Sequence, residues 1–264
     1  MLVLVLGYIS CAAVMAMLWL WQRKTHKSSL VDLVWTLCVG AFAITLILVN
    51  PLQVLIHHYA VIAVLSLWTL RLSLTLYLRY RVLPEDARYE KAKGQWGANA
   101  QAKMFAFYQL QAIFALLFAA PFVVFSFEPK LPVKLSIYDV TGTVVAALSL
   151  LGLTISDYQL TLHRKLRLEE AATERICKSG LWKYSRHPNY FFEWLHWCSY
   201  LPLALQFNYG WLYAIHPLTV LYLLLFKTGI PLTERHMVES YGEYYREYQR
   251  HTSAFVPWPK KTNI

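Results

Sequence analysis

The chain has 264 residues, of which 57% are hydrophobic, and its mean hydropathy is +0.37. Apolar runs of about 20 residues recur along it, and a helix of that length spans a bilayer, so the composition excludes an ordinary soluble domain. The formal net charge of +10 does not indicate nucleic-acid binding, because the basic residues lie in loops between the apolar runs and no nucleic-acid motif is present.

Seven apolar runs are predicted to form membrane-spanning helices. In chain order they cover residues 2–21, 30–49, 54–78, 105–125, 138–160, 191–205 and 211–226. The polar stretches between them are predicted to be loops, including 79–103 and the basic stretch 161–187, and a polar tail follows residue 226. Asn50-Pro51 is predicted to be a tight break. No basic stretch precedes the first run, so a cleaved signal peptide is not expected.

The distribution of charge predicts the topology. Lysine and arginine are concentrated in the first, third and fifth loops and in the tail, whereas the opposite side carries only Lys130 and Lys134. The positive-inside rule then predicts an all-α polytopic membrane protein with seven transmembrane helices, its N-terminus outside and its C-terminus in the cytoplasm. Residues 1–264 are treated as a single membrane domain. A bacterial inner membrane, with a site facing the cytoplasm, fits this pattern.

Several kinds of site are not indicated by the sequence. The four cysteines (Cys11, Cys38, Cys177 and Cys198) have neither metal-binding nor redox spacing, and no His/Cys spacing suggests zinc. Neither a Rossmann nor a P-loop fingerprint is present. A nucleotide bound by this chain would therefore need a different kind of site.

The stretch 180–197 combines basic and polar residues with the start of an apolar helix. Pro188 is predicted to begin that helix, because the missing N–H of proline would be unpaired at that position in any case. The free N–H groups of the first turn, with Arg186 and His187 beside them, form a candidate anion site. Glu193 lies about one turn inside the helix.

Four ionisable residues lie within or at the ends of predicted spans, namely Asp32, Arg71, Asp157 and Glu193. One interpretation is that they form structural ion pairs or interfacial charges. The other is that they line a ligand cavity open to the cytoplasm, because buried charges need partners or water. Glu85, Asp86, Arg88 and Tyr89 in the third loop are interpreted as a solvated turn.

The tail carries tyrosines at helical spacing. Met237, Tyr241, Tyr245 and Tyr248 follow an i, i+4, i+8, i+11 pattern, which predicts one face of a single helix. This helix could rest at the bilayer interface. Alternatively, it could close over a cofactor bound against the fifth loop.

Three blocks in order resemble the steroid 5-alpha-reductase family, and most closely its bacterial polytopic membrane branch. The blocks are Ser156-Asp157-Tyr158 with Arg164, Ser185-Arg186-His187-Pro188-Asn189-Tyr190 with Glu193, and Tyr241-Gly242-Glu243-Tyr244 through Tyr248 to Pro257. The resemblance covers residues 138–259. It is looser before that region, where Asp32, Trp35 and the stretch from Trp68 to Arg71 match the bacterial branch.

The resemblance implies a membrane reductase with a role in lipid metabolism. NADPH would bind in a cytoplasm-facing cavity, and its hydride would pass to the beta carbon of an enone-like lipid or steroid-like substrate that enters from the bilayer. The residues implied to contact the cofactor are Asp157, Arg164, Tyr184, Asn189 and Glu193, with Arg186, His187, His236 and Tyr241 as neighbours. Arg164 or Arg186 would bind the 2′-phosphate.

The resemblance also bears on the catalytic group. In the steroid reductases, a tyrosine on an early helix and a glutamate before it hold the substrate carbonyl. Here Trp68 stands at the position of that tyrosine, and Asp32 is the catalytic candidate by position. Phe192 stands where the bacterial branch commonly has glycine, which is expected to narrow the cavity.

A second resemblance points to a different reaction. Membrane isoprenylcysteine-type methyltransferases, which bind S-adenosylmethionine, share an Arg-His-Pro-X-Tyr stretch like the one from Arg186 to Tyr190, and a tail like the one formed by Glu234 and 241–245. Asn189 with Glu193 and the upstream Asp157 block favour the reductase. A third interpretation is a lipid-binding or scaffold protein without catalytic activity.

Overall fold

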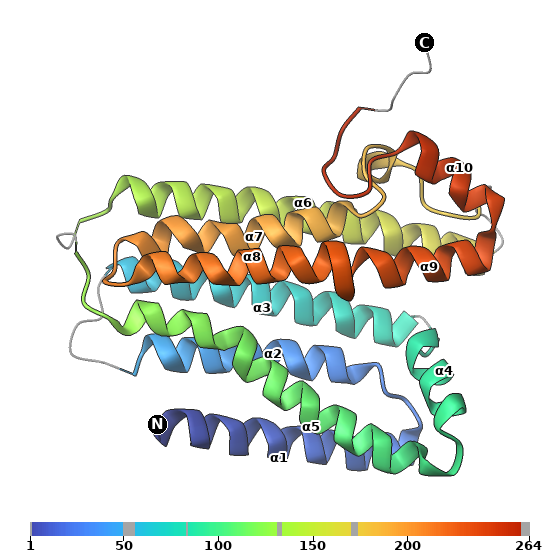
Figure 1. Cartoon of the computed structure of the whole chain (residues 1–264), viewed down its shortest axis with the longest axis horizontal. Coiled ribbons are helices and arrows are strands. Elements are labelled where there is room, and N and C mark those ends of the chain that lie inside the picture. Colours follow the sequence, from blue (N-terminus) through green and yellow to red (C-terminus); the bar gives the residue numbers. More distant parts are fainter. Residues whose placement is uncertain (1, 50–55, 83, 131–133, 170–173, 260–264) are drawn as a thin grey trace. The chain divides into compact units, whose positions relative to one another are not determined.

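The protein is helical throughout the part of the chain that its structure, a computed structural model, describes. The described residues are 2–49, 56–82, 84–130, 134–169 and 174–259. No β-strand occurs within these ranges, so the all-α prediction is confirmed for them. Figure 1 shows these helices, coloured from blue at the N-terminus to red at the C-terminus. Contacts divide the chain into two compact units, Met1–Lys134 with Gln206–Gly210 (unit 1) and Leu135–Leu205 with Trp211–Ile264 (unit 2).

Several helices are long and apolar enough to cross a membrane. Among the described residues there are six, covering Leu2–Thr25, Leu30–Ile47, His57–Val82, Arg88–Ser126, Ile137–Leu168 and Gly210–Tyr241. They support an integral membrane protein. The predicted span at residues 191–205 corresponds to α7 (Pro188–Leu205), which is not among the six. The count of seven spans and their orientation therefore stay predictions.

In the described residues of unit 1 there are five α-helices and a short helical extension. They are α1 (Leu2–Thr25), α2 (Leu30–Ile47), α3 (Ile56–Val82), α4 (Ala87–Trp96) and α5 (Ala100–Ala119), followed by a 3₁₀ helix at Ala120–Ser126. α2 packs against both α3 and α5, and α1 packs against α5. Met15, Val31, Met104 and Tyr108 are buried where α1, α2 and α5 meet. The apolar faces of these helices thus form the core of the unit.

The third polar stretch is not the loop that the sequence predicts. α3 continues to Val82, and the charged segment after it forms α4, a short helix that Figure 1 shows at a steep angle to the long helices of unit 1. Asp86 caps α4, because its Oδ1 accepts a hydrogen bond from the backbone N–H of Arg88 at 3.0 Å. Tyr89 and Trp96, seven residues apart on α4, pack on the core of the unit. The prediction of a loop over 79–103 is therefore wrong.

Unit 2 contains the long helix α6 and four further α-helices. They are α6 (Ile137–Leu168), α7 (Pro188–Leu205), α8 (Ile215–Tyr222), α9 (Ile230–Tyr241) and α10 (Glu243–His251), with a π-helical turn at Leu223–Lys227 between α8 and α9. The start of α7 at Pro188 confirms the prediction for this proline. Asn50-Pro51 lies outside the described residues.

Small residues on α6 allow α7 to approach closely. A Cβ at Gly142 would lie 2.8 Å from the carbonyl oxygen of Ser199, and a Cβ at Gly152 would lie 2.4 Å from the ring of Phe192. Glycine at such positions is typical of closely packed helix pairs in membranes. The ring of Phe192 therefore fills the space over Gly152.

In unit 2, the end of α6 and the break in the tail differ from the prediction. α6 runs to Leu168 rather than ending at residue 160, so Arg164 lies on a helix instead of in a loop. The tail is not one helix, because Gly242 adopts a φ of +56° and separates α9 from α10. Tyr245 and Tyr248 are still buried together, since the turn brings them against Ile176.

Candidate functional site

Asp32, the predicted catalytic residue, lies in the first turn of α2 in unit 1. Its Oδ1 accepts a hydrogen bond from the hydroxyl of Tyr89 at 2.8 Å, and its Oδ2 accepts one from Nη2 of Arg88 at 3.2 Å. Tyr89 is buried, whereas the side chain of Arg88 is 69% exposed. The interpretation of this segment as a solvated turn is therefore wrong for Tyr89, which lies on α4 and is buried against Asp32, whereas Arg88 is exposed and binds Asp32.

Arg88 is shared between two carboxylates. In addition to Asp32, it binds Asp86 through Nε at 3.0 Å and through Nη2 at 2.9 Å. Burial alone would raise the pKa of Asp86, but the hydrogen bonds and charge of Arg88 outweigh it and lower that pKa below its usual value. The positive charge of Arg79 lowers the pKa of Asp86 in the same direction.

A cavity of about 320 Å³ opens beside Asp32. Its remaining lining residues are Arg88, Tyr89, Ala92, Trp96, Phe107 and Gln111. The polar groups of Asp32 and Arg88 thus share the cavity with aromatic walls from α4 and α5. A concave site with a mostly apolar lining and a few polar groups is the usual form of a small-molecule pocket, and this volume is near the lower end of the usual range.

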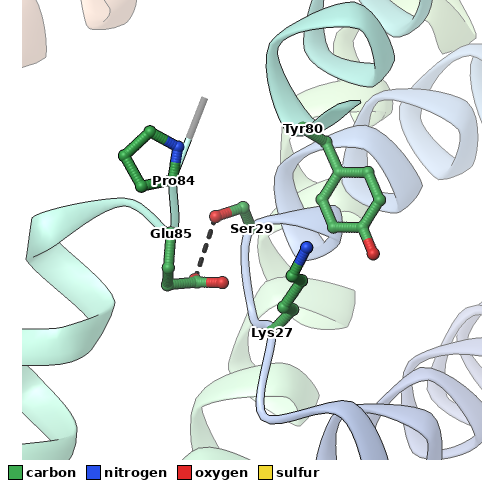
Figure 2. A pocket seen from close by; sticks show the side chains of 5 residues that line it. All are labelled: Lys27, Ser29, Tyr80, Pro84 and Glu85. Carbon is green, nitrogen blue, oxygen red and sulfur yellow. Dashed lines mark hydrogen bonds between the residues drawn. The ribbon is translucent and has the colours of Figure 1, made fainter. Parts of the chain in front are cut away.

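A second, smaller cavity lies nearby, and its lining residues hold two segments of the chain together. Figure 2 shows its lining residues, with the hydroxyl of Ser29 hydrogen-bonded to Glu85. Glu85 accepts from Oγ of Ser29 at 2.9 Å and from the backbone N–H of Ser28 at 3.0 Å, and the amine of Lys27 lies 5.1 Å from the ring centroid of Tyr80. The volume of about 10 Å³ is close to that of a single water. Glu85 therefore joins the start of α2 to the segment that begins α4.

In unit 2, the structure brings together residues from two separate blocks of sequence. Nδ2 of Asn189 on α7 donates to Oδ1 of Asp157 on α6 at 3.4 Å. Glu193 follows Asn189 by one helical turn, and its Oε1 accepts from the indole N–H of Trp197 at 2.9 Å. Arg164 is two turns beyond Asp157 on α6, and these four residues of α6 and α7 are half-buried.

Arg186 and His187 both contact a carboxylate in the tail, that of Glu234. Nε of Arg186 donates to Oε1 of Glu234 at 2.6 Å, and Nε2 of His187 lies 3.2 Å from the same oxygen. Nη1 of Arg186 also donates to the carbonyl oxygens of Gln249 and Thr252. The side chains of Arg186 and Glu234 are only 9% and 15% exposed. These contacts hold α9 and α10 on the start of α7.

The other predicted cofactor neighbours have different surroundings. Tyr184 and His236 are exposed. The hydroxyl of Tyr241 accepts from Nη1 of Arg167 at 2.6 Å, and the guanidinium of Arg167 lies 5.6 Å from its ring centroid. A contact of these three residues with a cofactor stays a prediction.

The predicted site residues therefore fall into two groups. Asp32 belongs to unit 1, and the nine predicted cofactor residues belong to unit 2. Sequence reasoning missed Trp96, Phe107 and Gln111 as lining residues. The spacing of Tyr89 and Trp96 after a capping aspartate was the signal that could have revealed α4. Among the described residues, no group of three or more His, Cys, Asp or Glu side chains is arranged to hold a metal ion.

Comparison with known proteins identifies the family. The family model described as "Protein of unknown function (DUF1295)" matches residues 18–252, which is most of the chain, so the chain belongs to this family. The match includes both the Asp32 cavity of unit 1 and the Asp157–Asn189 pair of unit 2. No curated protein and no solved structure matches the chain.

Proposed function

We propose that the protein is a membrane reductase that uses NADPH to reduce an enone-like carbon–carbon double bond in a hydrophobic substrate. The observation that carries this proposal is the hydrogen bond between Asn189 and Asp157. These residues are 32 positions apart and belong to two different blocks that resemble the steroid 5-alpha-reductase family. Their contact supports a shared role in one polar site between α6 and α7.

The residues of this site suit a nicotinamide nucleotide. Asp157 and Glu193 offer carboxylate acceptors for ribose hydroxyls, and the amide of Asn189 both donates and accepts. Arg164, half-buried on α6, offers a guanidinium for a phosphate. We assign the 2′-phosphate contact to Arg164, because it lies two turns from Asp157 on the same helix, whereas Arg186 binds the tail through Glu234 and two carbonyl oxygens. When bound, NADPH would supply the hydride.

In unit 1, Asp32 stays the catalytic candidate, with Arg88 as its partner. Asp32 accepts hydrogen bonds from Tyr89 and Arg88, so it holds both donors at the cavity wall. The two N–H groups on Nη1 of Arg88 have no hydrogen-bond partner among the described residues. They are therefore the donors that can polarise a carbonyl oxygen of the substrate.

The first experiment measures binding of NADPH, NADH and S-adenosylmethionine to the detergent-purified protein by thermal shift and calorimetry. Arg164→Gln is expected to weaken NADPH binding by roughly 1.5–3 kcal/mol, the usual loss for a hydrogen bond to a charged group. NADH binding should not change, because NADH has no 2′-phosphate. Lys165→Gln is the matched control, since Lys165 is exposed on the same helix. Equal NADPH affinity in both variants would remove Arg164 from the site.

One observation favours methyl transfer as a second candidate. Arg186 and His187 both contact Glu234, and these residues come from the two stretches that resemble the isoprenylcysteine-type methyltransferases. If S-adenosylmethionine alone stabilised the protein, the reductase proposal would be rejected in favour of methyl transfer. A folded protein that responds to none of the three compounds would favour a lipid-binding or scaffold role.

A further inference from the structure

The cavity of unit 1 contains a polar group that no contact within the described part of the chain satisfies. The carboxamide of Gln111 lines the cavity and has no hydrogen-bond partner among the described residues. Gln111 lies on α5, within a candidate membrane span, and only apolar residues follow it on that helix. A polar side chain is costly in such surroundings unless it binds a partner.

The walls beside Gln111 are suited to an apolar ligand body. Phe107 precedes Gln111 by four residues, so both side chains lie on one face of α5. Trp96 and Ala92 on α4 complete the apolar part of the lining. A molecule in the cavity would therefore contact aromatic rings along its body and the carboxamide at one point.

The charged groups at the other part of the lining already bind one another. Both oxygens of Asp32 accept hydrogen bonds, one from Tyr89 and one from Arg88. The single positive charge of Arg88 is shared between Asp32 and Asp86. An anionic ligand would compete with Asp32 and Asp86 for Arg88, and a cationic ligand would compete with Arg88 for Asp32. The open hydrogen-bonding groups, including Nη1 of Arg88, suit an uncharged partner.

We propose that the cavity binds a neutral amphiphile and that Gln111 determines specificity by binding its uncharged oxygen group. The carboxamide can donate to a carbonyl and accept from a hydroxyl, so either group fits. This inference rests on the proposed function only in so far as the ligand is the substrate of the reductase. Binding itself requires no cofactor.

A matched series of probes tests the proposal on the full-length, detergent-purified protein without nucleotide. Binding of tritiated farnesol is measured by scintillation proximity, with farnesene, farnesoic acid and farnesylamine as competitors. These compounds share one apolar chain and differ in the head, which is a hydroxyl, a hydrocarbon end, an anion or a cation. Farnesol is expected to bind most tightly. Gln111→Leu is expected to weaken farnesol binding about tenfold, as loss of one good hydrogen bond implies, and to leave farnesene unchanged.

The same helix offers a matched control. Gln109 is also a glutamine on α5, but its Nε2 donates to the carbonyl oxygen of Ala12 at 3.4 Å, and it does not line the cavity. Gln109→Leu should therefore keep the preference for farnesol. Gln111→Asn retains the amide on a shorter side chain and should give an intermediate affinity. Unchanged farnesene binding in each variant shows that the cavity remains folded.

The outcomes separate this inference from the proposed function. Equal binding of the four probes, or farnesol binding that Gln111→Leu does not weaken, overturns the inference even if NADPH binds. Selective loss in Gln111→Leu supports the inference. If NADPH does not bind in that case, the cavity remains a neutral-lipid site and only the reductase proposal fails.

Discussion

Each unit contains an arginine bound to carboxylates, and the two clusters differ in exposure. In unit 1, the side chain of Arg88 is 69% exposed, is shared between Asp32 and Asp86, and lines a cavity. In unit 2, the side chain of Arg186 is 9% exposed and binds Glu234 together with two backbone carbonyls. The same residue types therefore have different roles. In the proposed function, Arg88 keeps donors for a ligand, whereas the contacts of Arg186 hold the tail against the start of α7.

The buried cluster connects three segments that are distant in sequence. Glu234 on α9 accepts from Arg186 before α7 and from Nε2 of Gln249 on α10 at 2.8 Å, and His187 lies against the same carboxylate. The hydroxyl of Tyr245 also donates to it at 3.4 Å. Removing one partner from such a cluster leaves a buried charge uncompensated, which costs more than the intact pair contributes.

The largest expected effect is therefore on stability, and it concerns Glu234. Glu234→Gln retains the side-chain shape but removes the negative charge opposite Arg186. We expect the free energy of unfolding to fall by about 3 kcal/mol. Thermal unfolding of the purified protein, followed by circular dichroism, measures the loss, and limited proteolysis should cleave the segment after α9 more readily in the variant.

An exposed ion pair provides the control for this effect. Glu243 binds Arg250 at 2.7 Å, and both side chains are more than half exposed. Because exposed pairs contribute little, Glu243→Gln should leave thermal unfolding almost unchanged. If the two variants lost equal stability, the difference in burial would not explain the roles of the two clusters.

The next effect is expected at the exposed cluster and concerns turnover. Asp32→Asn should lower turnover of an enone lipid without weakening NADPH binding, because Asp32 holds Arg88 and Tyr89 at the cavity rather than the nucleotide. The loss of stability should be only about 1 kcal/mol, since the side chain of Asp32 is partly exposed. Steady-state kinetics and calorimetry separate the two effects.

Glu90→Gln is the control for Asp32→Asn. Glu90 is an exposed acidic residue that follows Tyr89 on α4, and it does not line the cavity. Its substitution should leave turnover unchanged. Unaltered turnover in Asp32→Asn as well would remove Asp32 from the mechanism.

The sequence predicted the apolar helices well, because a long apolar run is a local property that both burial and membrane insertion require. The sequence also predicted the start of α7, because proline is favoured at the first position of a helix. It failed at α4, where charged residues hide an amphipathic pattern that becomes buried only against α2 and α5. Gly242 was a visible sign of a break, but the tyrosine spacing favoured a continuous helix.

The candidate site could be predicted only in part. The resemblance named both Asp157 and Asn189 as cofactor-binding candidates, and the structure brings their side chains within hydrogen-bond distance. Their contact with a cofactor stays a prediction. No local pattern could show that Asp32 contacts Arg88, because they are 56 residues apart. Glu85, which binds Ser28 and Ser29, also joins the start of α2 to the segment before α4. The contact between Arg186 and Glu234, which are 48 residues apart, could likewise not be predicted from a local pattern.

The smallest expected effect tests how Arg88 is shared, through the pH dependence of Asp86→Asn. Asparagine caps a helix as well as aspartate does, so the variant removes the charge and keeps the cap. Burial would raise the pKa of Asp86, but Arg88 lowers it overall, so the folded protein binds a proton here less readily than the unfolded chain. The charge therefore stabilises the fold above about pH 4, and this contribution is lost as the pH falls through the folded pKa.

Wild type should thus exceed Asp86→Asn by less than about 1 kcal/mol at pH 7, and the difference should shrink in acid. Thermal unfolding of both proteins at pH 7 and at low pH measures it. A difference that does not change with pH would mean that the charge of Asp86 adds no stability through Arg88. Asp32 would then be the main partner of Arg88.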